Sequence, residues 1–90
     1  MVVHVFISGF VQGVGFRQFV KRTAKNFGFK GWVRNLPDGR VEALFSGEKE
    51  KIEKTVEALW KGPFLSEVKN IVVEKEEGSE EFKDFEIIKE

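Results

Sequence analysis

Two glycines and an arginine near the start of the chain are spaced so that they could hold an anion. They lie in VQGVGFR, residues 11–17, which we call the glycine loop and which separates a predicted strand from a predicted helix. At a helix start, backbone N–H groups are unpaired and the helix dipole adds partial positive charge. Gly13 and Gly15 would let successive N–H groups point inward, and Arg17 could add a two-pronged contact to two phosphate oxygens.

The glycine loop also has a simpler interpretation, an ordinary strand-to-helix turn followed by a surface arginine, and the local chemistry leaves both open. A cation in the first helical turn is unfavourable by roughly 0.3–1 kcal/mol against the dipole, and a bound anion would remove that penalty. The loop lacks the Lys-Ser/Thr ending of a Walker motif, and Gln18 stands where the dinucleotide pattern needs its third glycine. The loop is therefore sized for one phosphoryl group rather than a nucleotide.

Composition narrows the class of protein. Ninety residues predict one domain, residues 1–90, and the absence of cysteine excludes disulfides, thiolate zinc sites and cysteine nucleophiles. Fifteen basic and fifteen acidic residues cancel, which argues against a broad surface for nucleic acid. No apolar run approaches a membrane span, and the N-terminal MVVHVFISG lacks the basic start of a signal peptide. We therefore expect a cytoplasmic protein with neither a nucleic-acid nor a membrane partner, and its abundant Lys and Glu are typical of a heat-adapted source.

Periodicity predicts the elements that position these residues. Alternating apolar residues indicate strands over 2–8, 29–35, 40–46 and 67–75, with a short fifth strand at 85–87. An apolar stripe at helical spacing predicts a first helix over 16–27, directly after the glycine loop. A second helix is predicted from the buried stripe Ile52, Val56, Leu59 and Trp60, with Ser46 or Gly47 as its cap.

The order of these elements, β-α-β-β-α-β, predicts a ferredoxin-like α/β (α+β) sandwich. An antiparallel sheet of four to five strands would carry both helices on one face. The stretch LPDG, residues 36–39, has the chemistry of a tight turn and makes the second and third strands a hairpin. Alternation along the second strand puts Arg34 and Asn35 on opposite faces, so Arg34 is expected at the surface.

Two long motifs resemble the signatures of the acylphosphatase family. The first is GFVQGVGFR, residues 9–17, and the second is GWVRN, residues 31–35, followed at the family's spacing by Gly39-Arg40-Val41 and Gly47. The resemblance covers essentially the whole chain, and the family's small α/β sandwich agrees with the predicted elements. It implies hydrolysis of a small-molecule acyl phosphate to a carboxylate and inorganic phosphate, with inorganic phosphate expected to inhibit and with no cofactor or metal.

The resemblance also implies roles for particular residues. Arg17 would be the phosphate-binding arginine, and Asn35 would orient the attacking water. The backbone would wrap the phosphate along Gln12, Gly13, Val14, Gly15, Phe16 and Arg17. No residue near either motif is an obvious general base, so we expect the phosphate of the substrate to take the proton of the water itself.

Other chemically capable residues have structural interpretations. His4 lies in mid-strand and is predicted to be a sheet-face residue rather than a base. Trp32 and Trp60 are expected to be core or sheet-face aromatics, and Gln12 is expected to order its loop.

Two alternative functions share the predicted fold. One is an RNA-binding module, but the third strand, RVEALFSG, lacks a basic-aromatic platform. The other is a relative of the acylphosphatase-like domains in hydrogenase maturation proteins that handle carbamoyl phosphate, which the short chain disfavours. No feature of the sequence specifies an oligomeric state.

Overall fold

A computed structural model describes residues 1–76 and 81–89 of the chain. Its strands are β1 (Val2–Phe10), β2 (Lys30–Asn35), β3 (Val41–Ser46), β4 (Glu67–Glu76) and β5 (Phe85–Ile87). Its helices are α1 (Phe16–Asn26) and α2 (Ile52–Lys61), and a 3₁₀ turn, η1 (Lys49–Lys51), leads into α2. The predicted element order and ferredoxin-like class are confirmed, and the segment between β4 and β5 falls partly outside the described residues.

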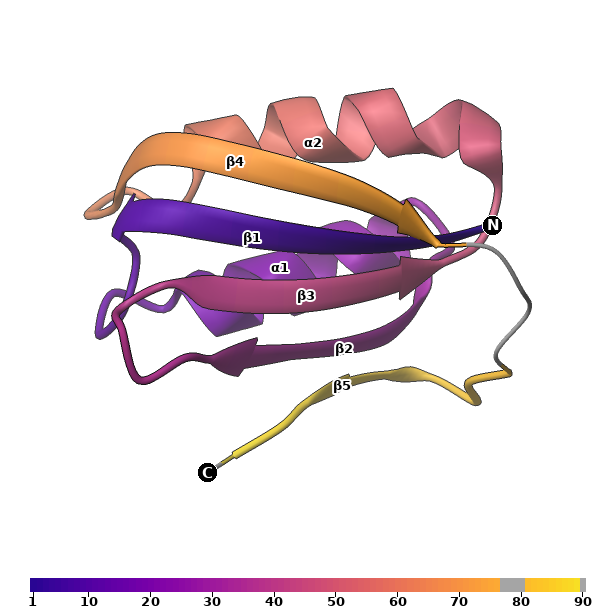
Figure 1. Ribbon diagram of the computed structural model, residues 1–90, viewed down its shortest axis with the longest axis horizontal. Helices are drawn as coiled ribbons and strands as arrows, with labels where there is room; N and C mark the ends of the chain where they lie inside the picture. The colour runs from indigo at the N-terminus through magenta and orange to yellow at the C-terminus, as the bar shows by residue number, and fades with distance from the viewer. Residues whose placement is uncertain (77–80, 90) are drawn as a thin grey trace.

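The five strands form one sheet in the order β4-β1-β3-β2-β5 (Figure 1). β1 lies between β3 and β4 and is antiparallel to both, and β2 is antiparallel to β3. β5 departs from the antiparallel expectation, because it pairs in parallel with β2, with Gly31 opposite Phe85. The strand β4 runs in the direction opposite to β2. The chain reverses direction after β4, so β5, which joins the far edge of the sheet, runs parallel to β2.

Both helices pack on one face of the sheet, where they enclose the hydrophobic core (Figure 1). Alternate residues of β1 supply one wall of that core, and the apolar stripe of α1 supplies much of the other. The fully buried side chains include Val3, Val5, Ile7, Phe16, Val20, Phe45 and Phe85. The first residue of α1 is thus fixed in the core, which anchors the helix end beside the glycine loop.

The buried face of α2 differs from the prediction. Leu59 is fully buried and Ile52 packs against the core, but Trp60 is 45% exposed. Thr55 lies on the buried face instead and donates its hydroxyl hydrogen bond to the carbonyl of Lys51 at 2.8 Å. Thr55 and Leu59 are four residues apart and share one helix face, so the next residue along, Trp60, is turned about 100° away toward solvent.

The predicted cap of the second helix is also wrong. Ser46 belongs to β3, where it is paired with Val2 and Lys30. The chain instead turns through η1, and neither η1 nor α2 has a side-chain cap. The prediction failed because a 3₁₀ turn, a common lead-in to an α-helix, lies between β3 and α2 and places the helix start beyond Ser46 and Gly47.

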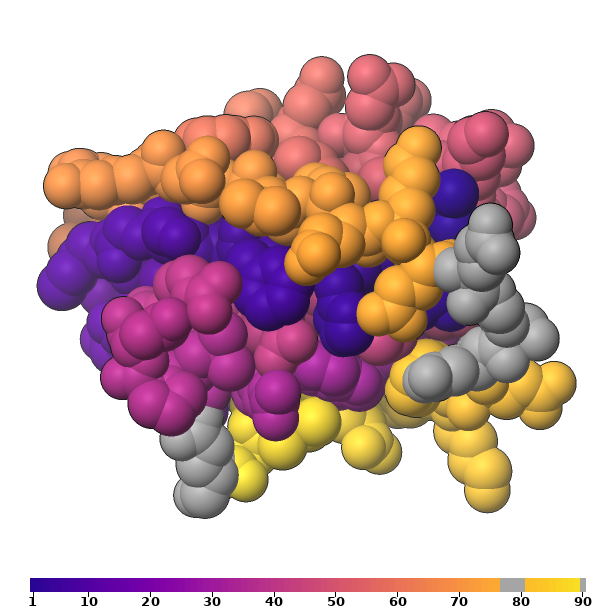
Figure 2. Space-filling model, in the orientation of Figure 1, coloured from indigo at the N-terminus to yellow at the C-terminus, as the bar shows by residue number. Residues whose placement is uncertain are grey.

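No helix of the described residues covers the opposite face of the sheet (Figure 2). His4 lies on it, with Nδ1 2.5 Å from the Glu76 carboxylate and Nε2 3.6 Å from the Glu42 carboxylate. Glu42 is buried and accepts a hydrogen bond from Nε of Arg34 at 2.7 Å, while the Arg34 guanidinium lies over the Trp32 ring. The sheet-face assignments of His4 and Trp32 are therefore confirmed.

Candidate active site

The glycine loop joins β1 to α1 through a left-handed backbone. Gly13 and Gly15 have φ values of 76° and 78°, which other residues rarely adopt. A Cβ added at either position would meet no atom within 4 Å, so the backbone angle, rather than crowding, requires glycine here. The first α1 hydrogen bond from this loop runs from the Phe19 N–H to the Gly15 carbonyl at 3.1 Å, and no acidic residue lies in the first turn. The N–H groups before Phe19 therefore lie at an open, electropositive helix end.

Gln12 ties this loop to the turn between β2 and β3. Its Nε2 donates to the carbonyls of Leu36 and Arg40, each at 2.9 Å. The expectation that Gln12 orders its loop is confirmed, and the structure adds that it does so against a second segment. The turn itself closes through the Leu36 N–H, which donates to the Arg40 carbonyl at 2.8 Å. The loop and the end of β2 are thus held in a fixed relation.

The turn is further ordered by Asp38, as its LPDG sequence predicts. One carboxylate oxygen accepts the Arg40 backbone N–H at 3.1 Å, and the other accepts from Nε of Arg40 at 2.8 Å. These hydrogen bonds lower the pKa of Asp38 below its ordinary value. The stabilisation is therefore present above the ordinary pKa and is lost as the pH falls through the lowered one.

Gln12→Ala should weaken both the fold and the site. The variant loses two hydrogen bonds, each worth about 0.5–1.5 kcal/mol net, so the free energy of unfolding should fall by about 1–3 kcal/mol. Denaturant titration measures that change, and steady-state kinetics should show a raised KM because the loop is less well held. Gln18→Ala is the control for stability, since Gln18 is exposed on α1 and has no such bonds. If the two variants were equally stable, the hydrogen bonds of Gln12 to the β2–β3 turn would not stabilise the fold.

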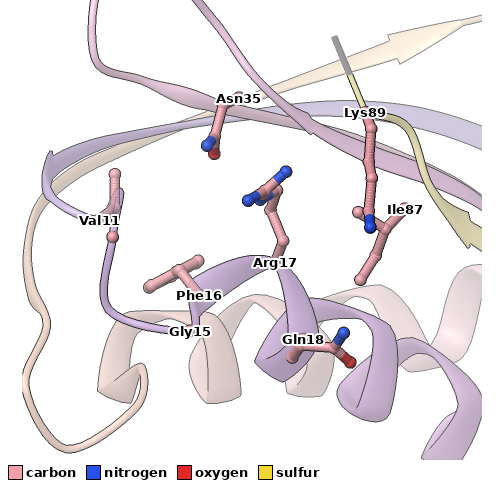
Figure 3. A pocket seen from close by; sticks show the side chains of 9 residues that line it. Val11, Gly15, Phe16, Arg17, Gln18, Asn35, Ile87 and Lys89 are labelled. Atoms are coloured by element: carbon pink, nitrogen blue, oxygen red, sulfur yellow. The ribbon is translucent and has the colours of Figure 1, made fainter.

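A cavity of about 240 Å³ opens beside the loop (Figure 3). Gly13, Gly15 and Phe16 line it from the loop, and Arg17 lines it from the first turn of α1. Asn35 enters it from the end of β2, so the two predicted catalytic side chains face one space from separate elements. The motifs that carry them are therefore neighbours in the fold.

The remaining predicted contacts lie around that cavity. The partly buried Val14 side chain packs against the core, and Val14 lines neither this cavity nor the hollow beside it. Gln12 lines an adjoining hollow of about 540 Å³, together with Leu36 and Pro37 of the turn. Arg17, Asn35 and Lys89 line both spaces, so they stand at the junction of the two.

Asn35 presents a buried acceptor without a protein partner. Within residues 1–76 and 81–89, only its Oδ1 and Nε2 of His4 are buried side-chain atoms that lack a hydrogen bond. Buried polar atoms are nearly always paired, so Oδ1 calls for a donor from outside the chain, such as water. Arg34, the preceding residue, points to the other face of β2 and binds Glu42, as alternation predicted. It takes no part in the cavity.

Sequence reasoning gave no site role to Val11 and Gln18, which flank the predicted residues and line the cavity, and it missed Ile87 and Lys89 altogether. The latter two come from β5 and the segment just after it, which lie beside β2 because β5 pairs with that strand. The sequence pattern predicted the strand but contained no signal for the edge that it joins. Among the residues that the structure describes, no group of His, Cys, Asp or Glu side chains could hold a metal ion.

No helix in the described part of the chain is long and apolar enough to cross a membrane.

The element order, the mixed sheet and the single helix layer together define a ferredoxin-like α+β domain.

Comparisons with known proteins identify the family within that class. The acylphosphatase family model matches residues 3–87. An acylphosphatase of Syntrophobacter fumaroxidans is 49% identical over 84 residues, which are 93% of this chain and 87% of the relative. The crystal structure of acylphosphatase from Bacillus subtilis has a TM-score of 0.95 at 38% identity, over 99% of this chain and 100% of that one. The chain belongs to the acylphosphatase family, a family of hydrolases.

A third similarity is to part of a longer protein. The crystal structure of T. kodakarensis HypF has a TM-score of 0.85 at 33% identity, and the match covers 98% of this chain but 12% of that one. The fold of this chain therefore recurs as one portion of a larger molecule, whereas the acylphosphatases above match it along most of their length.

Proposed function

We propose that the glycine loop and Arg17 hold the phosphoryl group of an acyl phosphate while Asn35 aligns the attacking water. This arrangement would perform the hydrolysis of acyl phosphates that is the activity of the family to which the chain belongs. The observation that carries the proposal is that Asn35, whose buried Oδ1 has no hydrogen-bond partner among the described residues, lines the same cavity as Arg17 and the glycines. An acceptor placed there can take one hydrogen bond from a water and aim its oxygen at phosphorus.

The chemistry asks little of the protein beyond positioning. The water oxygen attacks phosphorus as the bond from phosphorus to the acyl oxygen breaks, and the electron pair of that bond leaves with the carboxylate. A carboxylate is a stable leaving group and needs no strong acid to depart. Phosphoryl transfer spreads negative charge over three equatorial oxygens, which loop N–H groups and the Arg17 guanidinium can stabilise.

The proton of the water passes to a phosphoryl oxygen of the substrate in this scheme. Neither the cavity nor the adjoining hollow is lined by an Asp, Glu or His in the part of the chain that the structure describes. A neutral amide at Asn35 can orient water but cannot remove its proton. The products are a carboxylate and inorganic phosphate, and the latter should bind the same loop. We further propose a cytoplasmic location, which the absence of cysteine supports.

Hydrolysis of benzoyl phosphate should be unchanged by a chelator and inhibited competitively by inorganic phosphate. The scheme assigns every step to the chain and the substrate, so removal of divalent ions leaves its rate unaltered. Inorganic phosphate competes because it fits the same binding site, which the glycine loop and Arg17 form. Initial rates with and without EDTA, across a phosphate series, measure both effects. Activity lost on chelation and restored by one added metal would contradict the scheme.

A further inference from the structure

One side of the cavity is formed by residues to which the proposed chemistry gives no role. Gln18 of α1, Ile87 of β5 and Lys89 line that side. Figure 3 shows the Arg17 side chain between Asn35 and these C-terminal residues, with the Lys89 amine near Ile87. In-line displacement places the attacking and leaving oxygens on opposite sides of phosphorus. If Asn35 aligns the water, the acyl group therefore leaves toward Ile87 and Lys89.

The charge of Lys89 is available to a ligand. Its side chain is exposed, and within residues 1–76 and 81–89 no carboxylate forms an ion pair with it. No acidic side chain lines either space around Arg17 in that part of the chain. Ile87, which packs partly against the core, adds a fixed apolar surface beside the amine. This side of the cavity thus combines an apolar wall with a cation at its rim.

We propose that Lys89 selects acyl phosphates whose acyl group carries a second negative charge, such as a carboxylate beyond a short apolar stem. The stem lies against Ile87 and the distal carboxylate pairs with the Lys89 amine. This inference rests on the proposed function, because it takes the phosphoryl group to be held by the glycine loop. Lys89 is a specificity residue in this scheme, and it takes no part in breaking the phosphorus–oxygen bond.

The test compares two aromatic substrates, benzoyl phosphate and 4-carboxybenzoyl phosphate, of which only the second carries a distal carboxylate. The measured quantity is the ratio of their kcat/KM values, charged over uncharged. Lys89→Met should lower this ratio by about two- to fivefold, the range expected for one exposed ion pair. Lys89→Glu should lower it further, and high salt should lower it in the unmodified protein because exposed charges are screened.

Lys83→Met is the matched control, since Lys83 is an exposed lysine outside the cavity and just before β5. Its ratio should equal that of the unmodified protein. The proposal would be overturned if the ratio were the same in Lys89→Met and Lys89→Glu as in the unmodified protein. That result would arise if both substrates lost activity equally or if neither lost any. Failure of the proposed function is distinguishable, because then the unmodified protein would hydrolyse neither substrate or Arg17→Ala would hydrolyse both normally.

Discussion

Arg17→Ala should lower kcat/KM for benzoyl phosphate by about 10²–10³, the usual effect of removing one preorganised contact to a developing charge. Arg17 lines the cavity from the first turn of α1, where its guanidinium can bind two phosphoryl oxygens. Those oxygens are charged in both the bound substrate and the transition state, so KM should rise and kcat should fall together. Steady-state kinetics with a simple acyl phosphate measures both.

Two further variants sharpen this result. Arg17→Lys keeps the charge but loses the planar fork, so its activity should lie between the unmodified protein and Arg17→Ala. Arg22→Ala is the control, because Arg22 is exposed on the same helix and lines neither the cavity nor the adjoining hollow. If Arg17→Ala hydrolysed benzoyl phosphate as fast as Arg22→Ala does, Arg17 would have no role in phosphate binding.

The second large effect is expected at Asn35. Asn35→Ala should lower kcat by about 10²–10³ with little change in KM, because in the proposed scheme Asn35 contacts the water and not the bound phosphoryl group. Its Oδ1 has no protein partner, so the free energy of unfolding should not fall. Kinetics combined with denaturant titration separates this pattern from a damaged fold.

Asn70→Ala supplies the comparison for Asn35. Asn70 is an exposed strand asparagine in β4, far along the sheet order from β2, and its removal should leave kcat unchanged. A variant at Asn35 that raised KM and left kcat intact would assign Asn35 to substrate binding and remove it from water alignment.

The parts of the fold set by local patterns were predictable from sequence. The alternating residues of β1 and the stripe of α1 produced both elements nearly to their observed bounds. Arg17 and Asn35 each lie in a long motif. The β-α-β-β order alone brings the C-terminal ends of β1 and β2 to the same end of the sheet. That is why the predicted pair lines one cavity.

The features that sequence reasoning missed depend on long-range placement. The exposure of Trp60 follows from the rotation of α2, which turns Thr55 and Leu59 toward the core. The parallel pairing of β5 is decided by the edge that remains open once four strands have paired, and no residue of β5 encodes it. Lys89 was overlooked for the same reason, since its place beside Arg17 exists only when β5 has joined β2.

The double hydrogen bond of Gln12 has a consequence for how activity appears during folding. It joins the glycine loop to acceptors 24 and 28 residues further along the chain. The loop therefore reaches its final position only when the β2–β3 hairpin is in place. Recovery of hydrolysis after dilution from denaturant reports that these two distant segments have been brought together.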